Sequence, residues 1–236
     1  MHIIDFHSHI LPGVDDGSTD LEMSAEMLRT AAAQGIRVQV VTPHFYATRM
    51  NLDSFFIARD HAVQRLLPIA QSKGIQLRVG AEVALYNKMS ESDKLKKLCI
   101  NGSNVILIEM PFGQWTESDI DELEAISAKG FLPMIAHIER YFAYQRDRRP
   151  LDRLLRSKVI FQINCDSFTS FFRRGNLISE LENSVFVLGT NAHNADGRKP
   201  NMQTGREFMA EKLGAKALLD MDRIGNIILG YEKMPG

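Results

Sequence analysis

The amino-acid sequence predicts an α/β protein whose parallel strands close into a barrel, with residues 1–236 forming a single domain. Three observations support this prediction. Seven short segments rich in β-branched or apolar residues recur along the chain, stretches with helical periodicity follow most of them, and no linker or repeat divides the sequence. Such alternation implies a parallel sheet covered by helices. Seven units in one domain favour a closed or nearly closed barrel over the alternative, an open doubly wound sheet.

The expected strands are short runs dominated by branched aliphatic residues. They cover residues 2–7, 37–41, 76–79, 104–108, 132–136, 159–163 and 184–188. No glycine-rich phosphate-binding loop follows the first strand, which weakens a nucleotide-binding interpretation.

The expected helices are amphipathic stretches between these strands. They cover residues 21–34, 52–73 and 118–129, and one or two further helices lie between residues 205 and 229. Gly35 and Gly130 directly follow the first and third stretches, where glycine commonly ends a helix.

The composition narrows the class of protein. A net charge of −1 argues against a general nucleic-acid or membrane surface. Cys99 and Cys165 lie far apart and form no paired motif, which fits a reducing compartment. The first residues, MHIIDFHSH, lack the features of a signal peptide, and no window resembles a membrane-spanning helix. We expect a soluble, cytoplasmic protein that neither binds nucleic acid nor inserts into a membrane.

Histidines and carboxylates gather where the expected strands end. His7 and His9 follow the first strand two residues apart, so on an extended chain both side chains point to the same side and can hold one ion. Five of the seven histidines lie at such ends, where parallel barrels place their active sites. The candidate metal ligands are His7, His9, Asp16, His44, Glu82, Glu109, His137, Asn191 and His193.

A structural interpretation competes with this one for several of these residues. A single histidine at a strand end, such as His44 or His193, is more often a hydrogen-bonded structural group than a ligand. Glu82 and Glu109 could each be solvated carboxylates. Their convergence on one rim is what favours metal binding. Mixed imidazole and carboxylate ligands without cysteine suit manganese, iron or zinc.

Six motifs run along nearly the whole chain in the order HSHILPGVDDG, TPH, GAEV, ILIEMPF, MIAHIERY and NAHNADGR. Together they resemble the PHP (polymerase and histidinol phosphatase) superfamily, and within it the bacterial capsule and exopolysaccharide tyrosine phosphatases of the CpsB/CapC type. The resemblance implies a distorted (β/α)7 TIM-like barrel of the PHP type. It also implies a protein-tyrosine phosphatase in which a hydroxide bridging the metal ions attacks phosphorus.

The resemblance further implies about three divalent ions, of Mn, Fe, Zn or Mg. His7, His9, Glu82 and Asn191 would hold the first; Glu82, Glu109 and His137 the second; Asp16, His44 and His193 the third. Arg140 and Arg198 match the arginines that hold the substrate phosphate. The implied partner is a phosphotyrosine protein, the tail of a membrane-associated tyrosine autokinase. The sequence leaves the oligomeric state open.

Position 191 departs from the family pattern, because relatives usually carry aspartate where this chain has Asn191. An asparagine carbonyl can ligate a metal but brings no negative charge. A catalytically impaired phosphotyrosine-binding regulator is therefore one alternative function, and a small-molecule phosphatase of the histidinol-phosphate type is another. A metal-dependent amidohydrolase is disfavoured, because no expected strand ends in the bridging lysine typical of that class.

Overall fold

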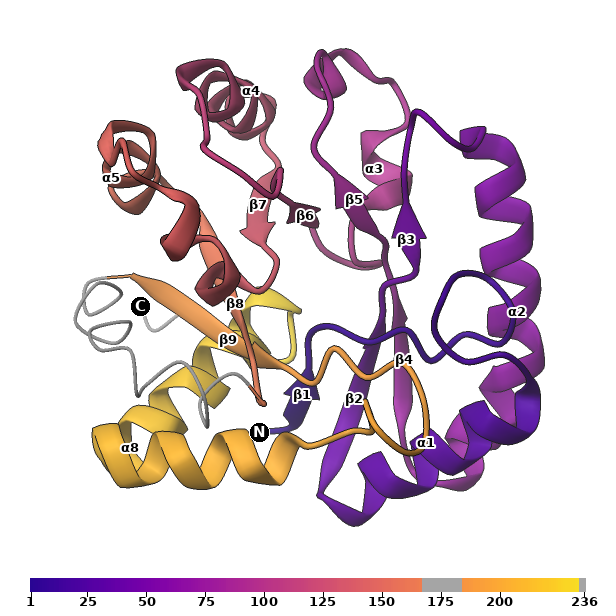
Figure 1. Ribbon diagram of the computed structural model, residues 1–236. Helices are drawn as coiled ribbons and strands as arrows, with labels where there is room; N and C mark the ends of the chain where they lie inside the picture. Colours follow the sequence, from indigo (N-terminus) through magenta and orange to yellow (C-terminus); the bar gives the residue numbers. More distant parts are fainter. Residues whose placement is uncertain (167–183, 234–236) are drawn as a thin grey trace.

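The computed structural model describes residues 1–166 and 184–233, with strands at the centre and helices packed around them (Figure 1). The strands are β1 (Ile3–Asp5), β2 (Ile36–Val41), β3 (His44–Phe45), β4 (Gln76–Val79), β5 (Glu82–Ala84), β6 (Val105–Glu109), β7 (Leu132–Ile135), β8 (Ile160–Asn164) and β9 (Val185–Gly189). The α-helices are α1 (Leu21–Ala33), α2 (Leu52–Ser72), α3 (Leu95–Leu98), α4 (Glu117–Ala128), α5 (Arg149–Leu155) and α8 (Met202–Ile228). Short 3₁₀ turns are η1 (Met89–Glu91), η2 (Ile138–Arg140) and η3 (Phe142–Tyr144).

Each of the seven segments expected to be a strand contains one, and all pairings among the described strands are parallel. The α/β class with parallel strands is therefore confirmed. The short strands β3 and β5 were not expected. Pro43 interrupts the run from β2 to β3, because proline has no N–H to donate to a ladder. The chain then resumes in the second sheet, where β3 pairs with β5.

The strands form two sheets with the orders β1-β2-β4 and β3-β5-β6-β7-β8-β9. Hydrogen bonds also join the segment that follows β1 to the last strand, β9, and to the residues after it. The Phe6 N–H donates to the carbonyl of Leu188 at 3.2 Å, and the Asn191 N–H donates to the carbonyl of His7 at 2.8 Å. The chain segments that follow β1 and β9 are thus held side by side, although about 180 residues separate them in the sequence.

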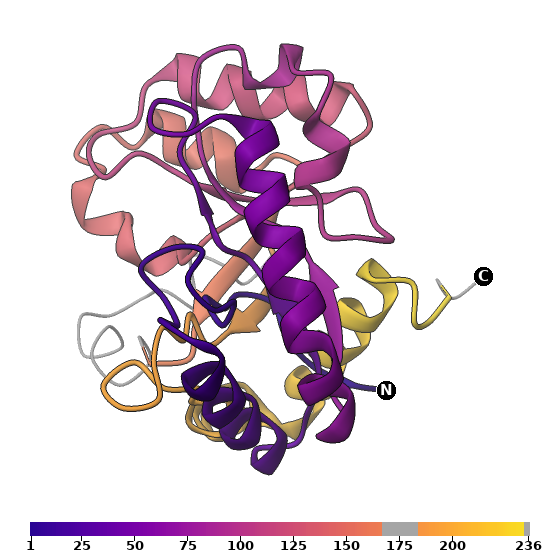
Figure 2. The same cartoon turned by 90° about the vertical axis from the view of Figure 1, so that its right-hand side faces the viewer.

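Side-chain caps determine where the principal helices begin. The Asp20 carboxylate accepts a hydrogen bond from the Met23 N–H at the start of α1, and Asn51 caps α2 in the same way. Thr116 and Asp119 form a capping box at the start of α4. Seen from the side, α2 crosses in front of the sheets (Figure 2). The last helix, α8, is interrupted at Gly214, whose φ of 84° is non-helical. One or two helices were expected in this part of the chain.

The core explains why the polar site lies at one end of the strands. Alternate residues of a strand point to opposite faces, so Val105, Leu107 and Glu109 share one face of β6. Val105 and Leu107 are buried in an apolar cluster, and Glu109 continues that face at the carboxyl end. On β8, Ile160 lies in the same cluster while Gln162 follows it on the same face. One sheet face is therefore apolar at the amino ends and polar at the carboxyl ends.

Among the described helices, none combines the length and apolarity needed to cross a bilayer.

Candidate metal centre

The structure brings the expected histidines and carboxylates together at the carboxyl ends of the strands. Among the described residues there are three groups, and within each group the potential ligand atoms all lie within 4.8 Å of one another. They are His9, Asp16, His44 and His193; His7, His9 and Glu82; and His44, Glu82 and Glu109. His137 joins them through Glu82, as the next contacts show.

Glu82 lies at the centre of these groups and is 1% exposed. Its Oε2 atom lies 3.0 Å from His7 Nε2 and 3.2 Å from His9 Nε2. The same oxygen lies 3.1 Å from His44 Nδ1. Its Oε1 atom lies 2.9 Å from His137 Nε2. One carboxylate thus contacts imidazoles that follow β1, β2 and β7, as a bridging ligand would.

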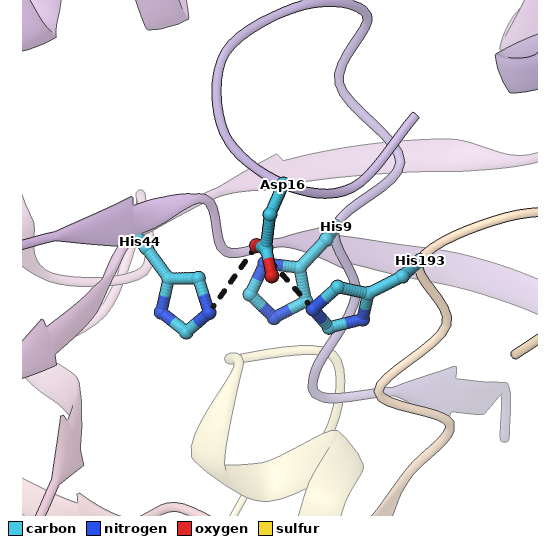
Figure 3. Close-up of side chains that lie close together, drawn as sticks. All are labelled: His9, Asp16, His44 and His193. Carbon is cyan, nitrogen blue, oxygen red and sulfur yellow. Dashed lines mark ion pairs between the residues drawn. The ribbon is translucent and has the colours of Figure 1, made fainter. Parts of the chain in front are cut away.

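A second arrangement surrounds Asp16, which comes from the loop between β1 and α1 (Figure 3). Asp16 Oδ1 lies 3.6 Å from His44 Nε2 and 3.6 Å from His193 Nε2. The His9 ring lies between the two groups, with its centroid 3.9 Å from that of His193. Asp16 is 67% exposed, so this group opens toward solvent. The open side leaves room for a water molecule or a substrate.

Gln162, which the sequence analysis did not single out, determines which nitrogen of His7 faces the centre. Gln162 Oε1 accepts a hydrogen bond from the His137 backbone N–H at 2.8 Å. Because a backbone N–H can only donate, this Gln162 atom is the carbonyl oxygen. His7 Nδ1, 2.8 Å from the same oxygen, must then carry a proton. The other ring nitrogen, His7 Nε2, therefore faces the centre and is the atom available to a metal ion.

Two further histidines are oriented in the same way. Asp15 Oδ2 accepts a hydrogen bond from His9 Nδ1 at 2.7 Å and another from the His44 N–H at 2.9 Å. His193 Nδ1 donates to the Asn191 carbonyl at 2.9 Å. In both rings Nε2 is left facing the centre. Such partners fix the tautomer and the ring orientation of metal-ligating histidines. Asp15 therefore orients a histidine, and Asp20 is the residue that caps α1.

The backbone at two site positions adopts the left-handed region that ordinary residues seldom occupy. His137 has a φ of 33° and Asn191 a φ of 49°. Asparagine tolerates this region well, whereas histidine there is less common. The conformations persist because the neighbouring chain is held firmly. Buried Asp5, for example, accepts hydrogen bonds from the side chains of Gln39 at 2.7 Å and Thr190 at 2.6 Å.

The electrostatics of the site indicate a deficit of positive charge. Burial and the nearby Glu82 carboxylate raise the pKa of Glu109 to about 7. Burial alone would lower the pKa of His9, but Asp15 and Glu82 outweigh it and raise that pKa to about 9. His7 Nε2 and His9 Nε2 also face each other at 3.0 Å, a pairing that requires a proton or a cation between them. A divalent cation would satisfy both the rings and the carboxylates, so the donor set fits the metals expected for it.

Two arginines stand beside the ligands. Arg198 Nη2 donates to Asn191 Oδ1 at 3.3 Å. Burial and the charge of nearby Arg140 lower the pKa of Arg198. Within the part of the chain that is described, the Arg140 side chain shows no hydrogen bond. Two neighbouring cations of this kind form a natural site for a phosphate.

Sequence inspection missed the residues that orient the ligands. Gln162 and Asp5 are fully buried polar residues within apolar strands. In the sequence, a polar residue inside an apolar run was the signal that pointed to each of them. Tyr46, whose hydroxyl lies 3.2 Å from His44 Nδ1, offered no signal beyond its position. Cys99 and Cys165 are free and buried.

Comparison with known proteins relates nearly the whole chain to one family. The profile of the family described as "Capsular polysaccharide synthesis, CpsB/CapC" matches residues 3–224. The tyrosine-protein phosphatase YwqE of Bacillus subtilis is 29% identical over 222 residues, 91% of this chain and 86% of YwqE. The tyrosine-protein phosphatase CpsB of Streptococcus pneumoniae is 29% identical over 227 residues, 91% of this chain and 92% of CpsB.

A solved structure from work on YwqE of Bacillus subtilis and CpsB of Streptococcus pneumoniae, described as unique metal-dependent tyrosine phosphatases, has the same fold. It superimposes with a TM-score of 0.79 at 24% identity, over 98% of this chain and 96% of that chain. The resemblance seen in the sequence motifs is thereby confirmed: the chain belongs to the CpsB/CapC family of capsular polysaccharide synthesis proteins.

Proposed function

We propose that this chain is a metal-dependent protein-tyrosine phosphatase that hydrolyses the phosphomonoester of phosphotyrosine in proteins. The relatives carry that activity in their names. The contacts that Glu82 makes with four histidines from three different strand ends support it most directly. A buried carboxylate among so many imidazoles is typical of a site that holds several cations.

We assign the ligands to about three divalent ions, of Mn, Fe, Zn or Mg. His7, His9, Glu82 and Asn191 would hold one, Glu82, Glu109 and His137 a second, and Asp16, His44 and His193 a third. The short distances from Glu82 to both His7 and His137 support its role as the bridge. His9 also lies within ligand distance of the third group, so it belongs at the boundary between two ions.

When bound, divalent ions lower the pKa of water and polarise a phosphoryl oxygen. The residues of the chain would bind the phosphate and orient the metal ligands. Arg140 and Arg198 would receive the equatorial oxygens of the phosphate and balance the negative charge that grows there. Gln162 and Asp15 keep the lone pairs of His7 and His9 directed inward. No thiol nucleophile is needed, and both cysteines are buried.

We further propose that residues 1–236 form one domain in which the two sheets close as a distorted (β/α)7 barrel. The hydrogen bonds between β1 and β9 support this closure. The substrate we propose is the phosphorylated tail of a membrane-associated tyrosine autokinase in capsule or exopolysaccharide synthesis, met in the cytoplasm. A flexible tail suits the site, because the group around Asp16 is open to solvent.

The decisive experiment measures bound metal and phosphotyrosine-peptide hydrolysis in the same preparations. We expect Glu82→Gln, which keeps the shape of the side chain and removes its charge, to lose both. His61→Gln is the matched control, because His61 is an exposed histidine of α2 outside the site. A Glu82→Gln protein with full activity and full metal content would overturn the assignment. Faster hydrolysis of histidinol phosphate than of phosphotyrosine would favour the small-molecule alternative.

Asn191 supports a second candidate function. Its neutral amide contacts Arg198 where relatives usually supply a carboxylate, so the chain could bind phosphotyrosine and release little phosphate. Calorimetry with a phosphotyrosine peptide, together with a phosphate-release assay, separates the two functions. Tight binding without phosphate release would identify a regulator, and steady release would identify an enzyme.

A further inference from the structure

An exposed aromatic side chain stands next to the metal centre. Phe112, in the loop between β6 and α4, is 54% exposed. Its ring lies 6.0 Å from that of His137, centroid to centroid, with 20° between their planes. His137 in turn contacts Glu82 at 2.9 Å. Phe112 is therefore a solvent-accessible ring within one side-chain length of the residues proposed to hold metal.

A second exposed ring forms a corner with Phe112. Tyr144 is 47% exposed, and its centroid lies 6.5 Å from that of Phe112 with the planes at 85°. Edge-to-face and offset contacts at centroid separations of about 4.5–7 Å are the favourable geometries for aromatic pairs. A third ring entering this corner could contact Phe112 and Tyr144 together.

The loop that carries Phe112 is held in place by buried hydrogen bonds. Trp115 Nε1 donates to the Pro111 carbonyl at 3.1 Å, and the Met110 N–H donates to the Tyr141 hydroxyl at 3.1 Å. Gln145 accepts from the Trp115 N–H at 3.0 Å and donates to the Gly113 carbonyl at 2.9 Å. These bonds fix the backbone on both sides of Phe112. A preorganised contact loses less entropy when a ligand binds.

We propose that Phe112, with Tyr144 across from it, is the specificity-determining residue that binds the aromatic ring of the substrate. This inference rests on the proposed phosphatase function, because it assumes that a phosphoryl group occupies the centre beside His137. The phosphate would be held at the ligands and arginines, and the phenol ring would extend toward Phe112. An alkyl phosphate would leave the corner empty. The site would thereby favour aryl over alkyl phosphomonoesters.

The test uses two phosphonates that cannot be hydrolysed, so it does not depend on turnover. Calorimetry on the metal-loaded protein would compare phenylphosphonate with methylphosphonate. We expect Phe112→Ala to weaken phenylphosphonate binding by about 3- to 10-fold, the effect of losing one aromatic contact, and to leave methylphosphonate binding unchanged. Tyr144→Ala should act in the same direction, and Phe112→Tyr should preserve binding. Leu219→Ala is the control, because Leu219 is equally exposed (54%) on α8.

A kinetic measurement adds an independent check. With phenyl phosphate, Phe112→Ala should raise KM by a similar factor and change kcat little, because the ring contact exists in both the ground and the transition state. Equal losses for both phosphonates, or no loss for either, would overturn the inference and leave the phosphatase assignment standing. If neither phosphonate binds to the parent protein, both proposals fail.

Discussion

Asn191 Oδ1 accepts a hydrogen bond from Arg198 Nη2 at 3.3 Å, which joins a proposed metal ligand to a proposed phosphate-binding residue. An asparagine in this position uses its one acceptor oxygen on the arginine. An aspartate would bring a second oxygen and a negative charge, so it could serve the arginine and a cation together. Asparagine at position 191 therefore affects both the proposed metal ligands and the proposed phosphate-binding arginine.

Asn191→Asp should strengthen metal binding and raise turnover. The added charge sits in a region that is 5% exposed, where electrostatic attraction to a cation is weakly screened. We expect metal affinity to rise by about 10-fold or more. Metal analysis after dialysis and a phosphotyrosine-peptide assay would check this. Unchanged metal content and unchanged turnover would show that the carbonyl oxygen of Asn191 is a sufficient ligand.

Gln162→Leu should reduce metal affinity by about 10- to 100-fold, because His7 Nδ1 and the His137 N–H would both lose their acceptor. It should also lower the free energy of unfolding by about 1–3 kcal/mol for the unpaired buried donors. Gln162→Glu keeps an acceptor oxygen and is the comparison. Metal titration and denaturant unfolding would measure the two effects separately. Equal metal affinity in the leucine variant would contradict the positioning role.

Removing metal should abolish activity and lower Tm. Without cations, burial and the charge of nearby Glu82 raise the pKa of Glu109 to about 7. A ligand present at 100 times its Kd stabilises a protein by about 2.7 kcal/mol. For a chain of this size that corresponds to a fall in Tm of about 5–10 °C on chelation. Scanning calorimetry with and without chelator, then with added Mn²⁺, would test it. Full activity in the chelated protein would exclude a metal-dependent reaction.

Thiol reagents should leave activity intact. Burial raises the pKa of the Cys99 thiol to about 11 and that of Cys165 well above its ordinary value. The thiolate is the reactive form of cysteine, and at pH 8 the thiolate fraction of Cys99 is about 0.1%. Iodoacetamide at pH 8 should therefore modify the folded protein slowly and modify it fully in denaturant, as mass spectrometry would show. Rapid loss of activity in step with alkylation would indicate a cysteine nucleophile.

Much of the site could be predicted because its elements are local in sequence. His7 and His9 follow a strand two residues apart, and parallel strands bring their carboxyl ends to one edge. Those two facts placed His44, Glu82, Glu109, His137 and His193 on the same rim. The strands were recognised because their aliphatic runs are distinct. The breaks between β2 and β3 and between β4 and β5 were not recognised, because they depend on which of the two sheets each strand joins.

By itself, then, the sequence determined the parallel α/β class of the fold, seven of the nine described strands and the candidate ligands, since strand patterns and side-chain chemistry are local properties of the sequence. Only the tertiary structure decided that Glu82 stands among four imidazoles, that Gln162 serves His7 and His137 with one oxygen, and that Phe112 lies open beside them. These relations join residues up to 155 positions apart. Distances of a few ångströms between such residues arise from packing of the whole chain, and no local pattern encodes them.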